Sequence, residues 1–448
     1  MKTKNNISNI ALLGLAVLLA FNFTACKKAT QVHEPLATAA QLKADSLLIE
    51  LSKDSALVVA EKEALVKLQA DSLYKVEDGK KSAELNAHYL ALAALEGSIN
   101  ALAVDYQFIW NDHAARQWHG LDVPATKWGL DNPDNVYRGA VLDSALTYEI
   151  KVTHLGKAPI QESFDVSAIQ TDSTKLGGQL SFIEIRNLKT DSLGNYVLTA
   201  NSKADATNKN HIQLKAASVN VLYRNTLSDW TLQTPTQIEV KVVAGTPKPS
   251  ASKEEIVKTA VAKLKTLVTT LLKGKNVWAG YNHKENFLAS PWKRDGGWGF
   301  AAGGHFSLGK DEAYVIKIKT KTARYIGFQL ADPWLASFDY VNYTASLNNT
   351  QAKPDKDGNY TYVLAATDPG VSNWLDSRNY QNGTYLIRWQ YLEDLTIKNI
   401  DDAIISQQVV KFADLQKYVG KELQKVSPEE RKKEQEDRAK SYLRRLSF

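Results

Sequence analysis

The chain has 448 residues and a formal net charge of +6, from 55 Lys and Arg against 49 Asp and Glu. It contains a single Cys, which excludes an internal disulfide, so burial alone must hold the fold; the length suffices for this and suggests two or three domains. The cations are dispersed and form no stripe interleaved with stacking aromatic residues, which argues against nucleic acid as a partner.

The N-terminus has the layout of an export signal. Lys2 and Lys4 precede an apolar run over residues 10–21 that is too short to span a bilayer. The run leads to Phe23-Thr24-Ala25-Cys26, which resembles the lipobox of bacterial lipoproteins, with Phe where Leu is commoner. The resemblance implies cleavage before Cys26 and a diacylglycerol on its thiol. We therefore predict a signal peptide at 1–25 and lipidation at Cys26; the alternative is an ordinary cleaved signal followed by a free Cys.

Helices are expected in the first part of the mature chain. A polar tether at 26–37 precedes a helical segment at 38–120, in which apolar residues recur near helical spacing over 38–74 and again over 82–116. The 38–74 helix is either a stalk that self-associates or a helix packed on the body; without a sustained heptad we favour packing.

Two strand-rich regions follow, at 121–246 and 276–396, in which β-branched and aromatic runs alternate with Gly, Asp and Asn. A linking helix is predicted at 252–274, because Ser252 and Glu255 have the spacing of a capping box and Gly274 is suited to the end of a helix. Residues 397–448 are expected to form C-terminal helices, the last one beginning at Ser427-Pro428.

The two strand-rich regions look like copies of one module. Gly194-Asn195-Tyr196 matches Gly358-Asn359-Tyr360, and Asn210 and Asn373 follow these glycines by 16 and 15 residues. Arg224 and Arg388 each lie 30 residues after the glycine and end an apolar run. We therefore predict an α+β fold, mainly β, with two tandem antiparallel β-sandwich modules and N-terminal, linking and C-terminal helices.

Part of the sequence resembles a catalogued family, domain of unknown function 1214. The densest match is the string Asp368-Pro369-Gly370-Val371-Ser372-Asn373-Trp374-Leu375-Asp376, within a likeness that covers 325–389. Residues 128–138 and 427–431 also resemble such proteins. The resemblance implies a jelly-roll-like β-sandwich. The family has no established reaction, so no catalytic residue can be carried over.

The candidate ligand-binding residues combine aromatic faces with Asn and Arg hydrogen-bonding groups in loops, a mixture that suits a sugar. They are Trp128, Asn135, Tyr137, Arg138, Trp334, Asn373, Trp374 and Arg388. The weak catalytic candidates are Asp134, Asp376, His305 and Tyr340. The structural alternative is that the Asx residues form turns and that the aromatic and Arg side chains anchor the core. A Gly- and Trp-rich stretch at 290–306 is either a lid that brings Trp292 and His305 over a ligand or a packed loop.

The sequence shows no metal signature, phosphate loop or nucleophile elbow, and we expect no metal and no cofactor. The leading hypothesis is a lipoprotein of the cell envelope, at the outer membrane foremost, facing the periplasm or the cell exterior. It would bind or act on a carbohydrate or another small polar ligand; as an enzyme it would be a carboxylate-dependent hydrolase or lyase of glycans. The alternative is a non-catalytic binding or scaffold protein of the envelope.

Overall fold

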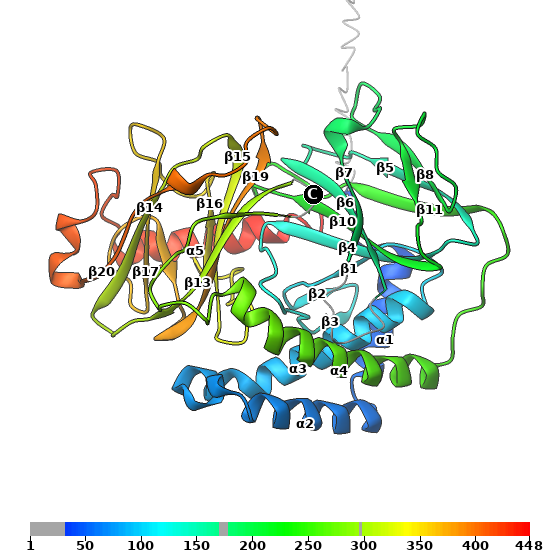
Figure 1. Ribbon diagram of the computed structural model, residues 1–448, viewed down its shortest axis with the longest axis horizontal. Helices are drawn as coiled ribbons and strands as arrows, with labels where there is room; N and C mark the ends of the chain where they lie inside the picture. The colour runs from blue at the N-terminus through cyan, green and yellow to red at the C-terminus, as the bar shows by residue number, and fades with distance from the viewer. Residues whose placement is uncertain (1–31, 170–177, 295–297) are drawn as a thin grey trace, which may run out of the picture. The chain divides into compact units, whose positions relative to one another are not determined.

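A computed structural model describes residues 32–169, 178–294 and 298–448. The predicted signal peptide and Cys26 lie outside the described residues. From His33 onward the chain consists of two β-sandwiches and a group of helices packed against both (Figure 1). The predicted class, α+β and mainly β with two antiparallel sandwich modules, is confirmed.

The helices fall before, between and after the sandwiches. They are α1 (Ala39–Leu51), α2 (Ser55–Gln69), η1 (Ser72–Lys75), α3 (Glu77–Leu102), η2 (Ile185–Asn187), α4 (Lys253–Trp278), η4 (Asp401–Ala403), η5 (Phe412–Lys417) and α5 (Pro428–Leu443). The Ser252 hydroxyl caps α4 by accepting from the backbone of Glu255, as predicted. Ser427 and Glu430 form a complete capping box at the start of α5, with Pro428 as its first residue.

The first sandwich has a five-stranded sheet and a four-stranded sheet. The five-stranded sheet contains, in order, β1 (Ile109–Asn111), β4 (Asn135–Asp143), β10 (Ser218–Thr226), β6 (Gln161–Ala168) and β7 (Gln179–Glu184). The four-stranded sheet contains β11 (Gln237–Ala244), β5 (Thr147–Thr153), β8 (Tyr196–Asn201) and β9 (His211–Gln213). A separate hairpin is formed by β2 (Arg116–Trp118) and β3 (Leu121–Val123).

The second sandwich repeats this arrangement. Its five-stranded sheet contains β12 (Trp292–Lys293), β13 (Gly299–Ser307), β19 (Asn382–Leu392), β15 (Ala323–Ala331) and β16 (Ser346–Asn348). Its four-stranded sheet contains β20 (Ile404–Lys411), β14 (Glu312–Ile318), β17 (Tyr360–Ala365) and β18 (Trp374–Asp376). Strand by strand, the connectivity is that of the first sandwich, including one parallel pair in each four-stranded sheet, β8 with β9 and β17 with β18.

The turns that indicated the repeat have the same conformation in both copies. The Asp191 carboxylate accepts hydrogen bonds from the backbone and side chain of Asn195, and Asp355 accepts the same two from Asn359. Between them Gly194 and Gly358 adopt φ values of +85° and +78°, in the left-handed region that favours glycine. With the matching strand order, these turns confirm the predicted duplication.

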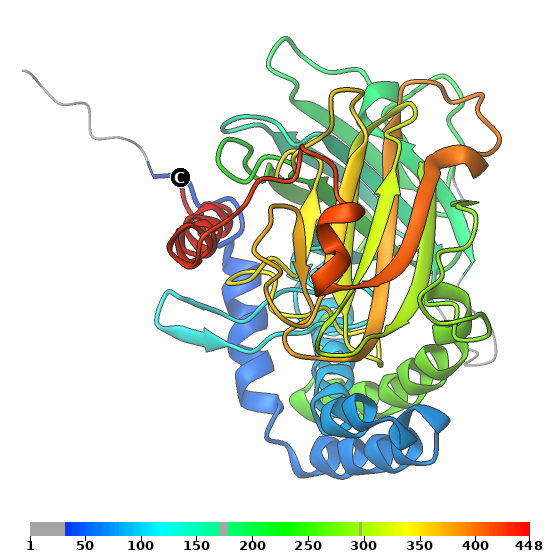
Figure 2. The ribbon, with the colours of Figure 1, turned by 90° about the vertical axis from the view of Figure 1, so that its left-hand side faces the viewer.

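Each sandwich encloses its own apolar core, and a third, larger core lies between the helices and the sheets. This third core joins α1–α4 to side chains on the outward faces of both five-stranded sheets, such as Ile109 and Leu386. Figures 1 and 2 show α1–α4 together on one side of the two sandwiches. The helices thus bind both repeats into one body.

Several predicted boundaries are wrong. The predicted 38–74 helix is broken at Ser52–Asp54, and the second helix ends at Leu102 instead of Arg116, because short strands follow it. The linking helix continues past Gly274 to Trp278. The predicted C-terminal helical region at 397–448 contains, after the short η4, the strand β20, which completes the second sandwich.

The predicted tether is also shorter than 26–37. The backbones of His33 and Phe448 exchange two hydrogen bonds of 2.9 and 3.1 Å, and Leu36 is buried in the helical core. The chain is therefore held against the body from His33 onward. Among the described residues, none of the helices is both long and apolar enough to cross a bilayer.

Candidate functional site

A pocket of about 350 Å³ lies between the two five-stranded sheets. Its walls come from both repeats: β4 and β10 of the first, β12, β13 and β19 of the second, and the end of α4. Trp292, which is 38% exposed, stands where the pocket meets solvent. The pocket is thus a product of the duplication, since neither module encloses it alone.

The alternation of strand side chains explains which residues reach it. In β10, Tyr223 points into the core of the first sandwich, so its neighbours Leu222 and Arg224 emerge on the other face and line the pocket. In β19, Ile387 points into the second core, and Leu386 and Arg388 line the pocket. The two central strands therefore present the same pair of residue types to the shared space.

A constant separation of 164 residues relates these positions in the two repeats. It links Leu222 to Leu386, Arg224 to Arg388 and, at the pocket wall, Trp128 to Trp292. The cross-strand partners of the two arginines have the same separation. Arg224 is paired with Tyr137 and Ser163, and Arg388 is paired with Ala301 and Gly327, each 164 residues further along. The pocket is therefore approximately symmetric in its backbone, and its side chains differ where the two copies have diverged.

The two equivalent arginines have different partners. The Arg224 guanidinium forms an ion pair with Asp165, Nη1 to Oδ2, at 3.3 Å. Gln329 occupies the equivalent position in the second repeat, and Arg388 Nη1 donates to its side-chain oxygen. Arg388 Nη2 donates to the backbone oxygen of Leu130. In the described part of the chain Arg388, which is 5% exposed, thus has neutral hydrogen-bond acceptors and no ion-pair partner.

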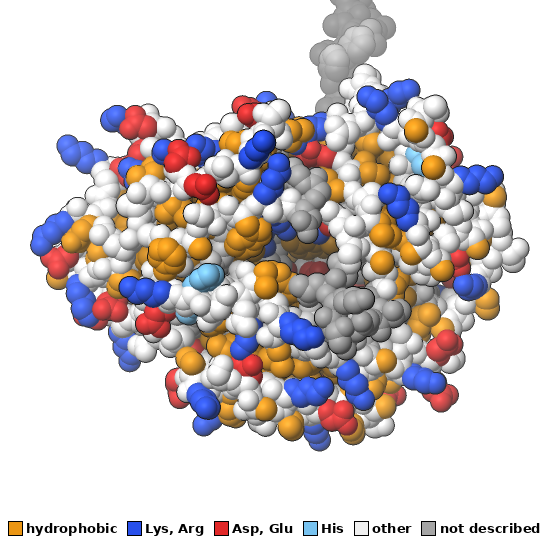
Figure 3. All heavy atoms as spheres, in the orientation of Figure 1, with side chains coloured by type: hydrophobic (Ala, Val, Ile, Leu, Met, Phe, Trp, Pro, Cys, Tyr) orange, Lys and Arg blue, Asp and Glu red, His pale blue; other side chains and the backbone are white. Residues whose placement is uncertain are grey.

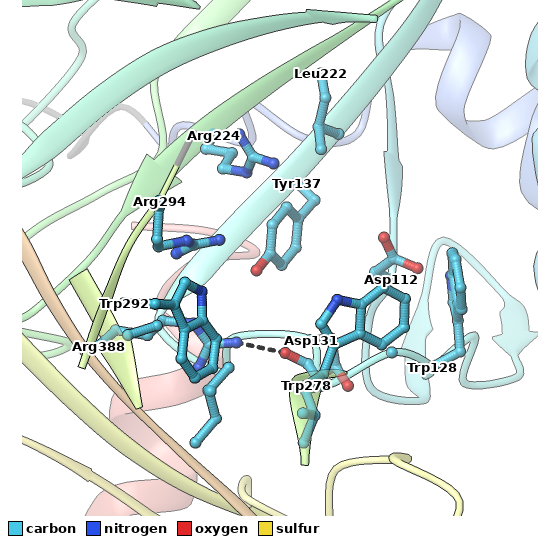
Figure 4. A pocket seen from close by; sticks show the side chains of 14 residues that line it. Asp112, Trp128, Asp131, Tyr137, Leu222, Arg224, Trp278, Trp292, Arg294 and Arg388 are labelled. Atoms are coloured by element: carbon cyan, nitrogen blue, oxygen red, sulfur yellow. Dashed lines mark hydrogen bonds between the residues drawn. The ribbon is translucent and has the colours of Figure 1, made fainter. Parts of the chain in front are cut away.

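A third arginine, Arg294, lies on the same side of the pocket as Arg224 and Arg388, across the Tyr137 ring from Asp112 (Figure 4). Burial, together with the nearby charges of Arg388 and Arg224, lowers the pKa of Arg294 well below its usual value. Three guanidinium groups therefore lie close enough in the pocket to repel one another.

Two carboxyl groups, Asp112 and Asp131, also line the pocket. Burial, reinforced by Glu96 and Asp131, raises the pKa of Asp112 well above its usual value. Burial also raises the pKa of Asp131, although Lys127 and a 2.6 Å hydrogen bond from Ser337 oppose the change. The second oxygen of Asp131 is buried without a hydrogen-bond partner in the described part of the chain. The pocket therefore holds groups suited to donating or accepting a proton.

The remaining walls are mostly aromatic and aliphatic. Trp128, Trp278, Trp292 and Tyr137 surround the space with flat faces. Flat apolar faces beside guanidinium and carboxyl groups are the combination that binds a ring-shaped ligand with polar substituents.

Three of the eight predicted ligand-binding residues line this pocket: Trp128, Tyr137 and Arg388. Two others, Asn135 and Arg138, belong to the same strand but do not line the pocket. Asn135 accepts a hydrogen bond from Thr226, and Arg138 is buried within the first sandwich, where it donates to Asn225 and Thr236. Strand alternation places Arg138 on the face opposite Tyr137, so the two cannot contribute to one site.

The other three predicted ligand-binding residues are structural in this fold. Trp334 is buried in the helical core and donates to the backbone oxygen of Gly79 at 2.7 Å. Trp374 is buried beneath Arg431 of α5. Asn373 bridges the backbone groups of Lys353 and Thr361, as Asn210 bridges the equivalent ones in the first repeat. The structure does not bring these three to the pocket.

The four weak catalytic candidates also lie outside the pocket. Asp134 accepts from Trp230, Tyr325 and Asn348. Asp376 binds its neighbour Arg378. His305 stacks on Tyr281, and Tyr340 is buried against Tyr442. The suggested carboxylate pair of Asp134 and Asp376 is therefore not formed around a ligand space.

Several pocket residues are marked in the sequence by the internal repeat and by no local motif. Arg224 marks the repeat in the sequence, but its place at a site follows only from pairing the two copies. A Trp-x-x-Asp string at Trp128–Asp131 recurs 164 residues later, beginning at Trp292. Asp112, Trp278 and Arg294 have no comparable sequence signal, because only tertiary packing brings them together. Within the described ranges, no three His, Cys, Asp or Glu side chains are grouped as metal ligands.

Comparisons with known proteins identify similar folds and no function. No family model and no curated protein matches the chain. Among solved structures it is similar to an uncharacterised protein from Burkholderia cenocepacia, with 20% identity and a TM-score of 0.64 over 83% of this chain and 99% of that one. A protein from Vibrio parahaemolyticus matches with 12% identity and a TM-score of 0.39, over 80% of this chain and 100% of that one, which is too weak to argue from. This chain therefore shares its architecture with the Burkholderia cenocepacia protein, and its function has to be argued from the site.

Proposed function

We propose that this chain is a lipid-anchored extracytoplasmic protein that binds a carbohydrate, or another small polar ligand, in the pocket between its two sandwiches. The observation that carries the binding part is the pocket's lining, in which three tryptophans lie beside guanidinium and carboxyl groups. A sugar ring has apolar C–H faces that stack on tryptophan and hydroxyls that bond to such polar groups.

A hydrolytic role would rest on Asp112 and Asp131, the two carboxyl groups of the pocket. Glycan cleavage needs one protonated acid to donate to the leaving group and one carboxylate as base or nucleophile. The raised pKa of Asp112 suits the first task. Binding without catalysis, as in an envelope scaffold, is the alternative, and release of product from a glycan distinguishes the two.

The envelope location rests on the sequence at Cys26, and membership of the domain of unknown function 1214 family rests on the match at 368–376. We propose both as part of the same account. Location and ligand binding are independent, so they are tested by separate experiments.

The binding proposal is tested with a glycan panel and the full chain purified in detergent. We expect Trp292→Ala to weaken binding of the retained glycan about tenfold, because a stacking face is lost from the pocket. Trp292 is partly exposed, so the midpoint of chemical unfolding should change little. Fluorescence titration and guanidinium unfolding measure the two effects.

Trp374→Ala is the matched control, because Trp374 is a predicted binding residue that is buried away from the pocket. It should cost about 3–5 kcal/mol of stability through the cavity it leaves, while the folded fraction binds the glycan normally. If instead Trp374→Ala abolished binding and Trp292→Ala did not, the ligand would not lie between the sandwiches.

The anchor is tested by Cys26→Ser expressed in a bacterium with a lipoprotein pathway. Without the thiol no diacylglycerol can be attached, and one acylated residue supplies most of the membrane affinity of such a protein. We expect incorporation of an alkyne-labelled fatty acid to disappear and the chain to leave the membrane fraction. A variant that stayed membrane-bound as firmly as the parent would contradict the lipid anchor.

A further inference from the structure

We infer that the ligand of the pocket carries an anionic group, a carboxylate, sulfate or phosphate, which Arg388 binds together with Arg224 and Arg294. This inference rests on the proposed function, because it names the chemistry of the ligand in the same pocket. It is drawn from a difference between the two repeats at equivalent positions.

The difference is that the second repeat has a neutral side chain where the first has a counter-ion. Asp165 and Gln329 both lie on the strand next to the central one, 164 residues apart, and each contacts its arginine through Nη1. In the first repeat the contact is an ion pair; in the second it joins a guanidinium to an amide. The second repeat thus keeps the arginine, buried, while placing a neutral side chain where its copy has a carboxylate. A buried charge without a counter-ion is costly unless a further group compensates it.

Within the described residues, the rest of the pocket compensates this charge only in part. Burial raises the pKa of both Asp112 and Asp131, which favours their neutral forms. Asp131 is attracted by Lys127 more than by Arg388, and its hydrogen bond comes from Ser337. Arg294 adds a further positive charge beside Arg388. In the described part of the chain the pocket thus has three guanidinium groups and one ion pair among them, Arg224 with Asp165.

Guanidinium groups bind carboxylate, sulfate and phosphate through paired hydrogen bonds that are stronger than those to neutral oxygens. Tryptophan faces next to them would hold the body of the same ligand. An anionic sugar, with a carboxylate or sulfate on its ring, fits both features.

The test compares two sugars that differ at one carbon, which is a carboxylate in glucuronate and a hydroxymethyl group in glucose, and adds sulfate as an anion without a ring. Binding of sodium glucuronate, glucose and sodium sulfate to the full chain in detergent is measured by calorimetry, with ionic strength held constant by sodium chloride. We expect glucuronate to bind at least tenfold more tightly than glucose, and sulfate to compete with it.

Three variants locate the effect. Arg388→Gln should abolish the preference for glucuronate. Asp165→Asn should strengthen glucuronate binding several-fold, because it frees Arg224 from its counter-ion as Gln329 leaves Arg388 free. Arg324→Gln is the control: Arg324 is exposed on β15, pairs with Glu393 and lies outside the pocket, so its loss should leave binding unchanged. If Arg388→Gln fails to fold, Asp165→Asn is the deciding variant. Asp165 is partly exposed, so this substitution should leave the protein folded.

The outcomes separate the two proposals. Equal binding of glucose and glucuronate, or no strengthening in Asp165→Asn, would overturn the anionic ligand and leave the carbohydrate pocket standing. Binding of neither sugar nor sulfate would overturn both. Sulfate and glucuronate binding that Arg324→Gln weakens as much as Arg388→Gln would show general attraction to a basic surface and would also overturn the inference.

Discussion

Replacing Asp134 by Ala is expected to cost about 3–5 kcal/mol of folding free energy at neutral pH, because each buried donor that loses its acceptor costs about 1–3 kcal/mol. Asp134 accepts hydrogen bonds from Trp230 Nε1 and Asn348 Nδ2 at 2.8 Å each and from the Tyr325 hydroxyl at 2.7 Å. Trp230 follows β10 in the first repeat, whereas Tyr325 and Asn348 belong to strands of the second. Removing the side chain of Asp134 therefore leaves an N–H of Trp230 and one of Asn348 without this acceptor and leaves the Tyr325 hydroxyl with Asn132 alone, and it breaks a link between the repeats.

Asp191→Ala is the control for this experiment. Asp191 also accepts hydrogen bonds from backbone and side-chain donors, at 2.8–2.9 Å, but its turn is exposed to water, which can replace the lost acceptor. Urea unfolding followed by tryptophan fluorescence should give a loss below about 1.5 kcal/mol for it. Equal losses for the two variants would show that Asp134 has no special role at the junction.

Glu96→Gln is expected to change how stability depends on pH. Burial raises the pKa of Glu96 to about 8 from its usual 4.5. Between these values the folded chain holds a proton that the unfolded chain has released, so stability falls as pH rises from about 4.5 to about 8. The amide cannot ionise, and the variant should lack this loss, which is on the order of a few kcal/mol.

The contacts of Glu96 support a neutral pair. His113 Nδ1 lies 3.0 Å from the backbone oxygen of Ala114, and Nε2 lies 2.9 Å from the Glu96 carboxyl. Burial lowers the pKa of His113 well below its usual value, so the neutral ring donates through Nδ1 and accepts the Glu96 proton at Nε2. A glutamine amide can make the same donation, so Glu96→Gln should keep the geometry.

The quantity to measure is the difference in free energy of unfolding between Glu96→Gln and the parent. Chemical unfolding at intervals from pH 4.5 to 8.5 gives it. His113 contributes its own slope as pH falls, but both proteins share it and it cancels. Glu63→Gln, which removes an exposed acid on α2, is the control and should follow the parent. A Glu96→Gln curve parallel to the parent's across this range would mean that Glu96 is ionised in the folded protein.

The sequence predicted the architecture better than the site, for a physical reason. Turn geometry is local: an Asp-x-x-Gly-Asn string needs little beyond its own backbone, so Gly194 and Gly358 reveal the duplication directly. The strand β20 was mistaken for helix because its residues 404–411, with three polar side chains at 406–408, show no clear alternation; pairing with β14 fixes its form.

The pocket depends on long-range contacts, which local patterns do not encode. Asn373 and Trp374 have the residue types of a binding loop, yet Asn373 fastens a turn and Trp374 fills a small core. Aromatic and Asx residues serve both purposes, so type alone does not distinguish them. Comparing the two repeats position by position is more informative: Arg224 and Arg388 match, and the change from Asp165 to Gln329 marks where the copies diverge in charge.

The most direct test of the account is a crystal structure of the chain with the anionic sugar that binds it most tightly from the glycan panel. We expect the sugar ring between the two five-stranded sheets, its acidic group within hydrogen-bonding distance of Arg388 and its ring against Trp292. A sugar bound on the outer surface of either sandwich, with the space between Arg224 and Arg388 filled by water alone, would contradict it.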